Sequence, residues 1–222
     1  MTDLSIEDLS KLLAAAPSPA KLLKSLIELE GPVSLRFGET HLNSDTEFLS
    51  TFYSIYILVL LWEDEVNEAH MLTRRLPQSL LRPDTFLQNA LSLLKAVWQE
   101  DYEQVYDQIR QPSWPDSLKP LVRSYQSYFQ DKAFEGLTRA YSAIRPSTLV
   151  FYLGLDPSVA TPTEAGTEDA SRELVSFLTK KGWEWDSESK LFTPKAAPVT
   201  KPVDSEAFKI GKLVGLIGTH GD

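Results

Sequence analysis

Few residues of this chain have the types and spacing that chemistry requires. None of the 222 residues is a cysteine, which excludes disulfides, thiolate metal ligands and a cysteine nucleophile. The histidines His41, His70 and His220 stand far apart, without a zinc-binding spacing such as His-Glu-x-x-His, and we expect His70 on an exposed helix face. The acidic stretch Glu63 to Glu68 lacks the alternating ligands and the glycine of an EF-hand, which favours a solvated turn. The sequence therefore predicts no catalytic residue, no metal site, no cofactor and no enzyme activity.

Net charge argues against nucleic-acid binding, and the length of the longest apolar run argues against a membrane span. The formal net charge is −9, whereas nucleic-acid binding rests on phosphate neutralisation by lysine and arginine. We therefore expect no nucleic-acid partner, and we interpret Arg74 and Arg75 as favourable charges at a helix C-terminus. The longest apolar run, Phe52 to Trp62, is shorter than the roughly 20 residues that cross a bilayer, which predicts a core helix and no membrane partner. The N-terminus lacks a basic region followed by an apolar core, so we expect no secretory signal.

The stretch from Trp98 to Trp114 is the clearest structural signal. Its apolar residues recur at helical spacing, a polar break interrupts them at Gln99 to Asp101, and Pro112 ends the pattern. This arrangement predicts a helix end, a tight turn, a second helix and a stop. Such a hairpin cannot bury its apolar face alone, so it needs copies of itself alongside.

The chain supplies candidate copies of this hairpin. Trp62 lies 36 residues before Trp98, and the residues that follow the two tryptophans match. A weaker third copy begins at Phe129, with Pro146 after it. Periods in the thirties are typical of helix-turn-helix repeats, although short amphipathic helices can also resemble one another by chance. In this interpretation a large aromatic residue fills the wedge between hairpins, and the structural repeat positions are Trp62, Trp98, Tyr102, Tyr106, Trp114 and Phe129.

The first 46 residues predict an extension with short helices. One helix follows Thr2 or Asp3 and ends before Pro17, and a second ends at Gly31-Pro32. Residues 33–44 carry no strong period and predict a loop, after which Ser44 or Asp45 can cap a helix that runs to Trp62.

The part of the chain after the repeats has a different character. A helix is expected over Lys132 to Ile144, and a short apolar segment over Ser147 to Leu155. Asp156 to Gly166 has the composition of a surface loop. Thr167 to Lys181 predicts a helix, with Gly182 as its terminating residue.

Two alternating segments then predict a β-hairpin. They are Trp183 to Asp186 and Lys190 to Thr193, joined by a polar turn. Helix, short helix, helix and a two-stranded wing is the order of a winged helix. The apolar wing side chains favour core packing, and an interface role is compatible because a two-stranded wing leaves an edge open to a neighbouring subunit. The candidate partner-binding residues of the wing are Trp183, Trp185, Leu191 and Phe192.

The chain ends in a Pro-rich linker and an apolar tail, residues 196–222. Gly211, Gly215 and Gly218 each cost about 1 kcal/mol of helix propensity, so the tail needs a partner to become ordered. Its candidate partner-binding residues are Phe208, Ile210, Leu213, Val214, Leu216 and Ile217.

Helical hairpins that run directly into a winged helix resemble the PCI-domain family, which occurs in the proteasome lid, the COP9 signalosome and a translation initiation factor complex. The motifs over Arg74 to Pro77, Trp98 to Trp114, Ala140 to Ile144, Phe151 to Leu155 and Gly182 to Asp186 resemble the subunit 8 family of the signalosome. Three features depart from that pattern: a longer N-terminal segment, an insertion over residues 156–166, and the glycines of the tail.

The resemblance implies a mainly α fold, with TPR-like hairpin repeats followed by a winged-helix subdomain with a small β-hairpin, together a PCI domain. The expected division is 1–46 for the extension, 47–131 for the repeats, 132–195 for the winged helix, and 196–222 for the linker and tail. The implied function is that of a non-catalytic scaffold subunit of the complex that removes a ubiquitin-like modifier from cullins. It implies other PCI-containing subunits as partners, a hetero-oligomer, and a location in the cytoplasm and nucleus. A proteasome-lid or initiation-factor subunit, or a winged-helix nucleic-acid binder, is the alternative.

Overall fold

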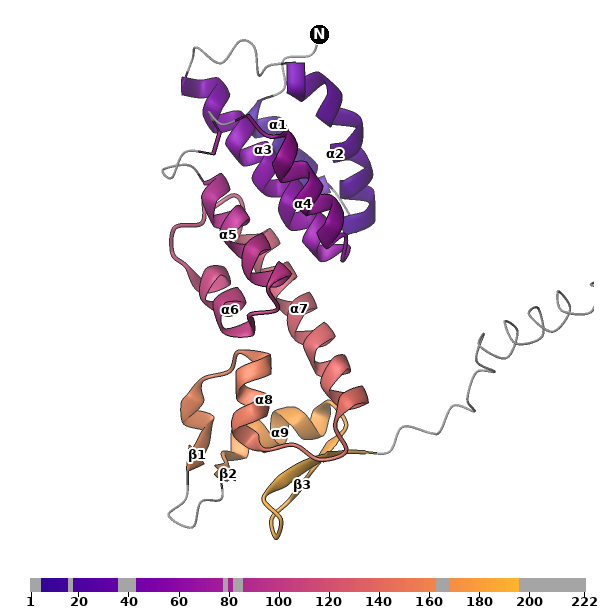
Figure 1. Cartoon of the computed structure of the whole chain (residues 1–222), viewed down its shortest axis with the longest axis vertical. Coiled ribbons are helices and arrows are strands. Elements are labelled where there is room, and N and C mark those ends of the chain that lie inside the picture. The colour runs from indigo at the N-terminus through magenta and orange to yellow at the C-terminus, as the bar shows by residue number, and fades with distance from the viewer. Residues whose placement is uncertain are drawn as a thin grey trace, which may run out of the picture. The chain divides into compact units, whose positions relative to one another are not determined.

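The computed structural model describes residues 5–15, 18–35, 43–77, 80–81, 86–162 and 168–195 (Figure 1). The chain forms two compact units, the first from residues 1–139 and 147–158, the second from residues 140–146 and 159–222. Most of the core belongs to the first unit. The predicted boundary between residues 131 and 132 falls inside one continuous helix, α7 (Lys119–Ala140).

The core of the first unit is built around α3 (Asn43–Trp62). Every residue from Phe48 to Leu61 is buried, because α1 (Ile6–Ala15), α2 (Pro19–Ser34), α4 (Val66–Arg75) and α5 (Leu87–Trp98) all pack against it. An apolar run with this many neighbours needs no polar face. None of the described helices is long and apolar enough to span a membrane. The prediction of a core helix over Phe52 to Trp62 is confirmed by α3.

The N-terminal segment is more ordered than its sequence predicts. Both expected helices exist, and Leu9, Leu22 and Leu26 are buried in the same core as α3. The predicted stop at Gly31-Pro32 is wrong, since α2 continues through Pro32 to Ser34. A proline this close to the helix end removes a single backbone hydrogen bond, and fully buried Val33 holds the last turn in place.

The 36-residue repeat is confirmed at the level of individual hydrogen bonds. The turn between α3 and α4 has Asp64 at φ 66°, and the turn between α5 and α6 (Tyr102–Arg110) has Glu100 at φ 55°. The residue after each turn position donates its backbone N–H to the carbonyl five residues earlier. Glu65 N–H donates to Leu60 C=O at 2.8 Å, and Asp101 N–H donates to Ala96 C=O at 3.0 Å. Both helices therefore end in the Schellman arrangement, which satisfies carbonyls left open at a helix end.

The third predicted hairpin is wrong. Phe129 lies inside α7, which runs without a turn from Lys119 to Ala140. Asp131 stands where the other two copies have Asp64 and Glu100, yet it stays helical. Phe129 is within 6 Å of the rings of Tyr102 and Tyr106 on α6, at 5.5 and 5.6 Å between centroids. Packing along the whole helix outweighs the local turn signal.

The last helix of this unit is α8 (Pro146–Leu153).

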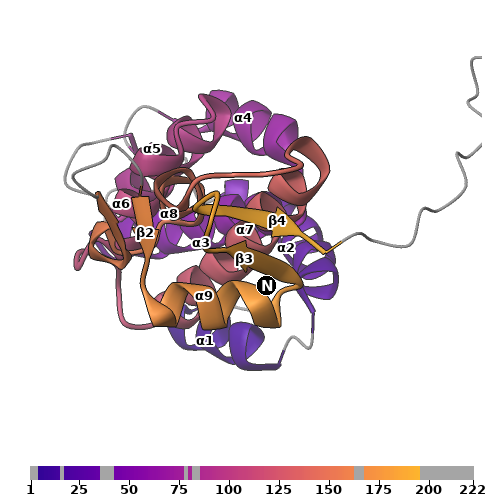
Figure 2. The same cartoon turned by 90° about the horizontal axis from the view of Figure 1, so that it is seen from below.

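The described residues of the second unit form two small antiparallel pairs and the α-helix α9. After the short 3-10 helix η2 (Pro157–Val159), β1 (Ala160–Pro162) pairs with β2 (Glu168–Ala170), and β3 (Trp183–Asp186) pairs with β4 (Leu191–Pro194). Between them lies α9 (Arg172–Lys180), beside β3 in Figure 2.

Three local predictions for this region need correction. The helix expected from Thr167 begins at Arg172, because Ser171 caps it by accepting the Leu174 N–H at 3.2 Å, and β2 precedes it. The helix expected to reach Ile144 ends at Ala140, and Ile144 instead forms a β-bridge with Phe192. The loop expected over residues 156–166 includes η2 and β1 among its described residues. The mainly α fold class with a small β-hairpin is confirmed.

Candidate subunit interface

The wing, defined as β3 and β4, has the register expected of a tight hairpin. Trp185 lies opposite Phe192, and Asp186 lies opposite Leu191. Trp183 and Phe192 are 1% and 0% exposed, so their side chains belong to the core, as the packing interpretation predicted. Trp185 and Leu191 are half-buried, and the Trp185 ring lies 4.6 Å from that of Phe192.

The wing turn is closed by its own side chains. The Asp186 carboxylate accepts the Glu188 N–H at 2.9 Å and the Ser189 hydroxyl at 2.6 Å. These hydrogen bonds favour the ionised carboxyl and lower the pKa of Asp186, the Ser189 hydroxyl contributing most. Lys190, at φ 57°, completes the reversal. The turn is therefore fixed, and it holds β3 and β4 in register.

One edge of the wing has backbone groups without strand partners. Phe192 and Ile144 exchange both backbone hydrogen bonds, each at 2.9 Å, so the Phe192 backbone faces away from β3. Trp185 is the direct neighbour of Phe192 across the ladder, and in an antiparallel pair its N–H and C=O must then also face outward. No described strand pairs with that outer edge of β3. Among the described residues this is an unpaired strand edge, whose backbone groups can pair with one more strand.

The predicted tail follows the last described residue, Lys195. Its six candidate partner-binding residues lie outside the described residues, as do the linker positions after Lys195. The candidate residues are Phe208, Ile210, Leu213, Val214, Leu216 and Ile217. Their role in partner binding stays a prediction.

The two repeat tryptophans have different surroundings. Trp62 is partly buried against the core and lines a groove of about 420 Å³ with residues of α1, α2 and α7. Trp98 is 49% exposed, and it does not fill a wedge between hairpins as expected. Its ring instead stacks on His70 of α4, with centroids 4.7 Å apart and planes 22° from parallel.

Three of the other repeat residues, Tyr102, Tyr106 and Phe129, form one aromatic cluster. Tyr106 is buried, and Tyr102 lies between Phe129 and Tyr152, at 5.5 and 4.8 Å between ring centroids. Burial raises the pKa of the Tyr106 hydroxyl far above its usual value. Trp114 is 3% exposed, and its indole N–H donates to the Gln108 carbonyl at 2.8 Å, which closes the corner after α6. These residues pack, and the Tyr106 hydroxyl and the Trp114 indole N–H serve as structural donors.

Three side chains from distant parts of the sequence hold the end of α8. The last carbonyls of a helix have no partner inside it. Here the Tyr106 hydroxyl donates to Tyr152 C=O at 3.0 Å, the Gln130 amide donates to Leu153 C=O at 2.9 Å, and Arg110 donates to Gly154 C=O. Gln130 and Arg110 give no signal in the sequence, because their partners lie 23 and 44 residues away.

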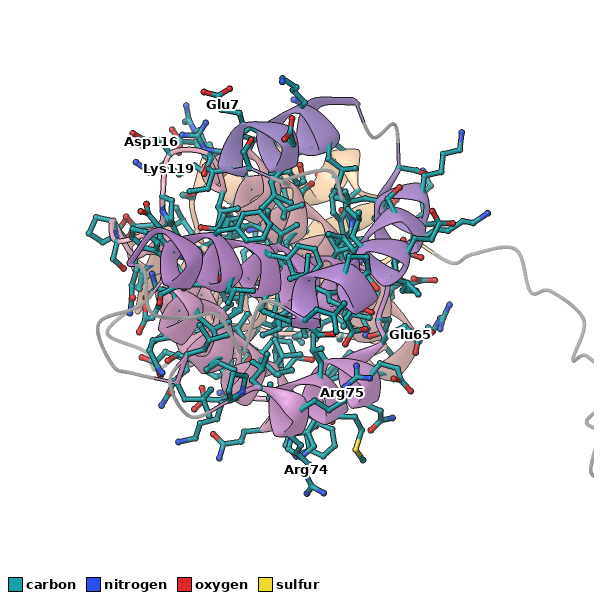
Figure 3. All side chains as sticks on the ribbon, turned by 90° about the horizontal axis from the view of Figure 1, so that it is seen from above. Glu7, Glu65, Arg74, Arg75, Asp116 and Lys119 are labelled. Carbon is teal, nitrogen blue, oxygen red and sulfur yellow. The ribbon has the colours of Figure 1, made fainter. Side chains whose placement is uncertain are left out.

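Several charged side chains lie on the surface of the first unit. Figure 3 shows Arg74 pointing away from the body, and Asp116 beside Lys119, with which it forms an ion pair at 2.6 Å. Arg75 pairs with Glu30 of α2 at 3.1 Å, an inter-helix contact that adds to its predicted effect at the C-terminus of α4. Exposed pairs of this kind contribute little to stability.

The described residues contain no group of three or more His, Asp or Glu side chains that could hold a metal ion. The predicted exposed position of His70 is corrected to a half-buried one, stacked on Trp98. The stacking contact gives the His70 ring a packing partner.

Comparison with known proteins gives the family. The sequence model of the CSN8/PSMD8/EIF3K family matches residues 47–203. A protein of Emericella nidulans named COP9 signalosome complex subunit 8 is 33% identical over 219 residues, 98% of this chain and 97% of that protein. Proteins of the same name from Arabidopsis thaliana and Dictyostelium discoideum are each 24% identical, over 74% and 72% of this chain and 77% and 72% of their own lengths. The resemblance predicted from the motifs is thus confirmed, and the chain belongs to the CSN8/PSMD8/EIF3K family.

Proposed function

We propose that this chain is a non-catalytic scaffold subunit of a COP9 signalosome, the complex that removes a ubiquitin-like modifier from cullins. The observation that carries the proposal is the 33% identity to a signalosome subunit 8 along 98% of the chain. The match covers the N-terminal helices as well as the family region, so it extends to the whole plan of the molecule.

The outer edge of β3 supports a way in which the subunit binds its neighbours. Trp185 presents an N–H and a C=O outward, and no described strand takes them. A strand from another PCI-containing subunit would pair with them, which is the strand-addition mode of recognition. The half-buried side chains of Trp185 and Leu191 lie on the same hairpin and can contact the added strand. Buried Trp183 and Phe192 keep the hairpin rigid for this purpose.

The apolar tail is the second contact. Its apolar residues would bind other subunits in the assembly. Removal of residues 204–222 should therefore weaken incorporation while the remaining protein keeps its helical circular dichroism. Unchanged co-migration of the truncated chain with the complex would refute the role of the tail. We place the protein in the cytoplasm and nucleus, which imaging of the tagged protein tests.

The proposal is tested by affinity purification of the tagged full chain from its own organism, with quantitative mass spectrometry. Signalosome subunits should be recovered in amounts comparable to the tagged chain. Recovery of proteasome-lid or initiation-factor subunits in their place would support one of the other complexes of this family and would refute the signalosome assignment.

A further inference from the structure

A second surface with the properties of a binding site lies between α4 and α5. It is a groove of about 220 Å³ in the first unit. Ligand pockets for drug-sized molecules occupy about 300–1,000 Å³, so this groove fits one bulky side chain better than a cofactor. Its walls are formed chiefly by His70, Thr73, Leu91, Leu94, Lys95 and Trp98.

The groove exposes a large aromatic surface. Trp98 stacks on His70 and still has 49% of its surface in contact with solvent, and Met71, the next residue on α4, is 51% exposed. Single exposed apolar residues are common, but a half-exposed tryptophan in the wall of an apolar groove, with an exposed methionine adjacent in sequence to its stacking partner His70, has the composition of an interface centre. The equivalent tryptophan of the preceding repeat, Trp62, has helices α1, α2 and α7 around its groove, whereas the described residues that line the Trp98 groove come from α4, α5 and Gln99, the C-cap of α5.

The charges beside the groove define the partner. Lys95 lines it and is exposed, and Arg74 follows His70 by one helical turn on α4 and points outward (Figure 3). Within the described residues neither cation takes part in an ion pair, although Arg75, next to Arg74, pairs with Glu30 at 3.1 Å. On a chain with a net charge of −9, two unpaired cations beside an apolar groove select an acidic partner and disfavour a second copy of the same chain.

We propose that this groove binds an acidic segment of another protein, which inserts one bulky apolar side chain beside Trp98 and places carboxylates against Arg74 and Lys95. The site is separate from the wing edge and does not depend on it. The groove is present in the isolated chain, so peptide binding to it can be tested without the complex. The signalosome assignment is tested by a different experiment, the affinity purification.

The test begins with a displayed library of short random peptides, selected on the full-length protein and counter-selected on the Trp98→Ser variant. The most enriched peptide is synthesised with a fluorescent label, and its affinity is measured by anisotropy at low and at high salt. Enriched peptides should combine several acidic residues with one large apolar residue, and high salt should weaken their binding.

Three variants of the full chain decide the outcome. Trp98→Ser should weaken binding about thirtyfold, as for a central aromatic of an interface. The pair Arg74→Glu and Lys95→Glu should weaken it about tenfold by turning attraction into repulsion. The pair Lys24→Glu and Arg123→Glu, at exposed cations outside the groove, changes the net charge equally and should leave binding unchanged.

Circular dichroism establishes that each variant is folded. The proposal is overturned if no peptide is enriched, if the enriched peptides are not acidic, or if the two charge pairs weaken binding equally. Sedimentation that shows dimers of the chain, dissociated by Trp98→Ser, would assign the groove to a second copy and would also overturn it.

Discussion

Gly154 is the position where one added methyl group should damage the first unit most. It follows α8 at φ +57°, a conformation that costs other residues roughly 1–2 kcal/mol. A Cβ there would lie 2.3 Å from Cγ of Tyr106 and within 2.5 Å of two further ring atoms. That ring is 1% exposed, and its hydroxyl is bonded to Tyr152 C=O at 3.0 Å, so it cannot move away freely. Overpacking of this kind costs about 1–3 kcal/mol. Gly154→Ala should therefore lower the free energy of unfolding by about 2–5 kcal/mol.

Urea unfolding followed by helix circular dichroism measures this loss, and two other glycines provide the controls. Gly182 has φ +90° with no atom within 4 Å of an added Cβ, so Gly182→Ala should carry only the backbone cost. Gly136 lies within α7 with equally free surroundings, and Gly136→Ala should raise stability by up to about 1 kcal/mol. Equal losses for Gly154→Ala and Gly182→Ala would show that the Tyr106 ring does not oppose the added methyl group.

Two further predictions concern a helix cap and a buried phenol. Asp101 caps α6 by accepting the Gln104 N–H at 3.1 Å, so Asp101→Ala should lower the free energy of unfolding in urea by about 1 kcal/mol. Asp107→Ala, on the exposed face of α6, should leave it nearly unchanged. Equal effects of the two substitutions would contradict the cap. Burial, helped by Glu30, raises the pKa of Tyr56 to about 12. Because the unfolded phenol ionises near pH 10, this contribution is complete below pH 10 and is lost as the pH rises toward 12. Tyr56→Phe should lessen the alkaline loss of stability in unfolding curves, and an unchanged pH profile would refute the assignment.

The sequence predicts the first two hairpins because their signals are local. The turn at Asp64 and the turn at Glu100 each follow a helix that ends in tryptophan, and the polar residues of the turn cannot enter the core. The same local pattern misleads at Phe129, where contacts with the aromatic rings of α6 keep the helix continuous. Those contacts join residues distant in the sequence, so a search for repeats does not reveal them.

The wing shows the same division between local and distant information. Alternation and a polar turn are sufficient to place β3 and β4 within one or two residues. The third partner, Ile144, is separated from Phe192 by nearly fifty residues and sits in a stretch with helical periodicity. Its bridge decides which edge of the wing is covered and which remains open, so the candidate docking edge could be located only in the structure.

Hydrogen exchange at the Trp185 amide tests the central claim, assembly through the outer edge of β3, most directly. In the isolated chain this N–H has no strand partner among the described residues and should exchange much faster than the Glu184 N–H, which faces β4. In the purified complex the Trp185 amide should become strongly protected while Glu184 changes little. Fast exchange at Trp185 in the intact complex would contradict strand addition at this edge.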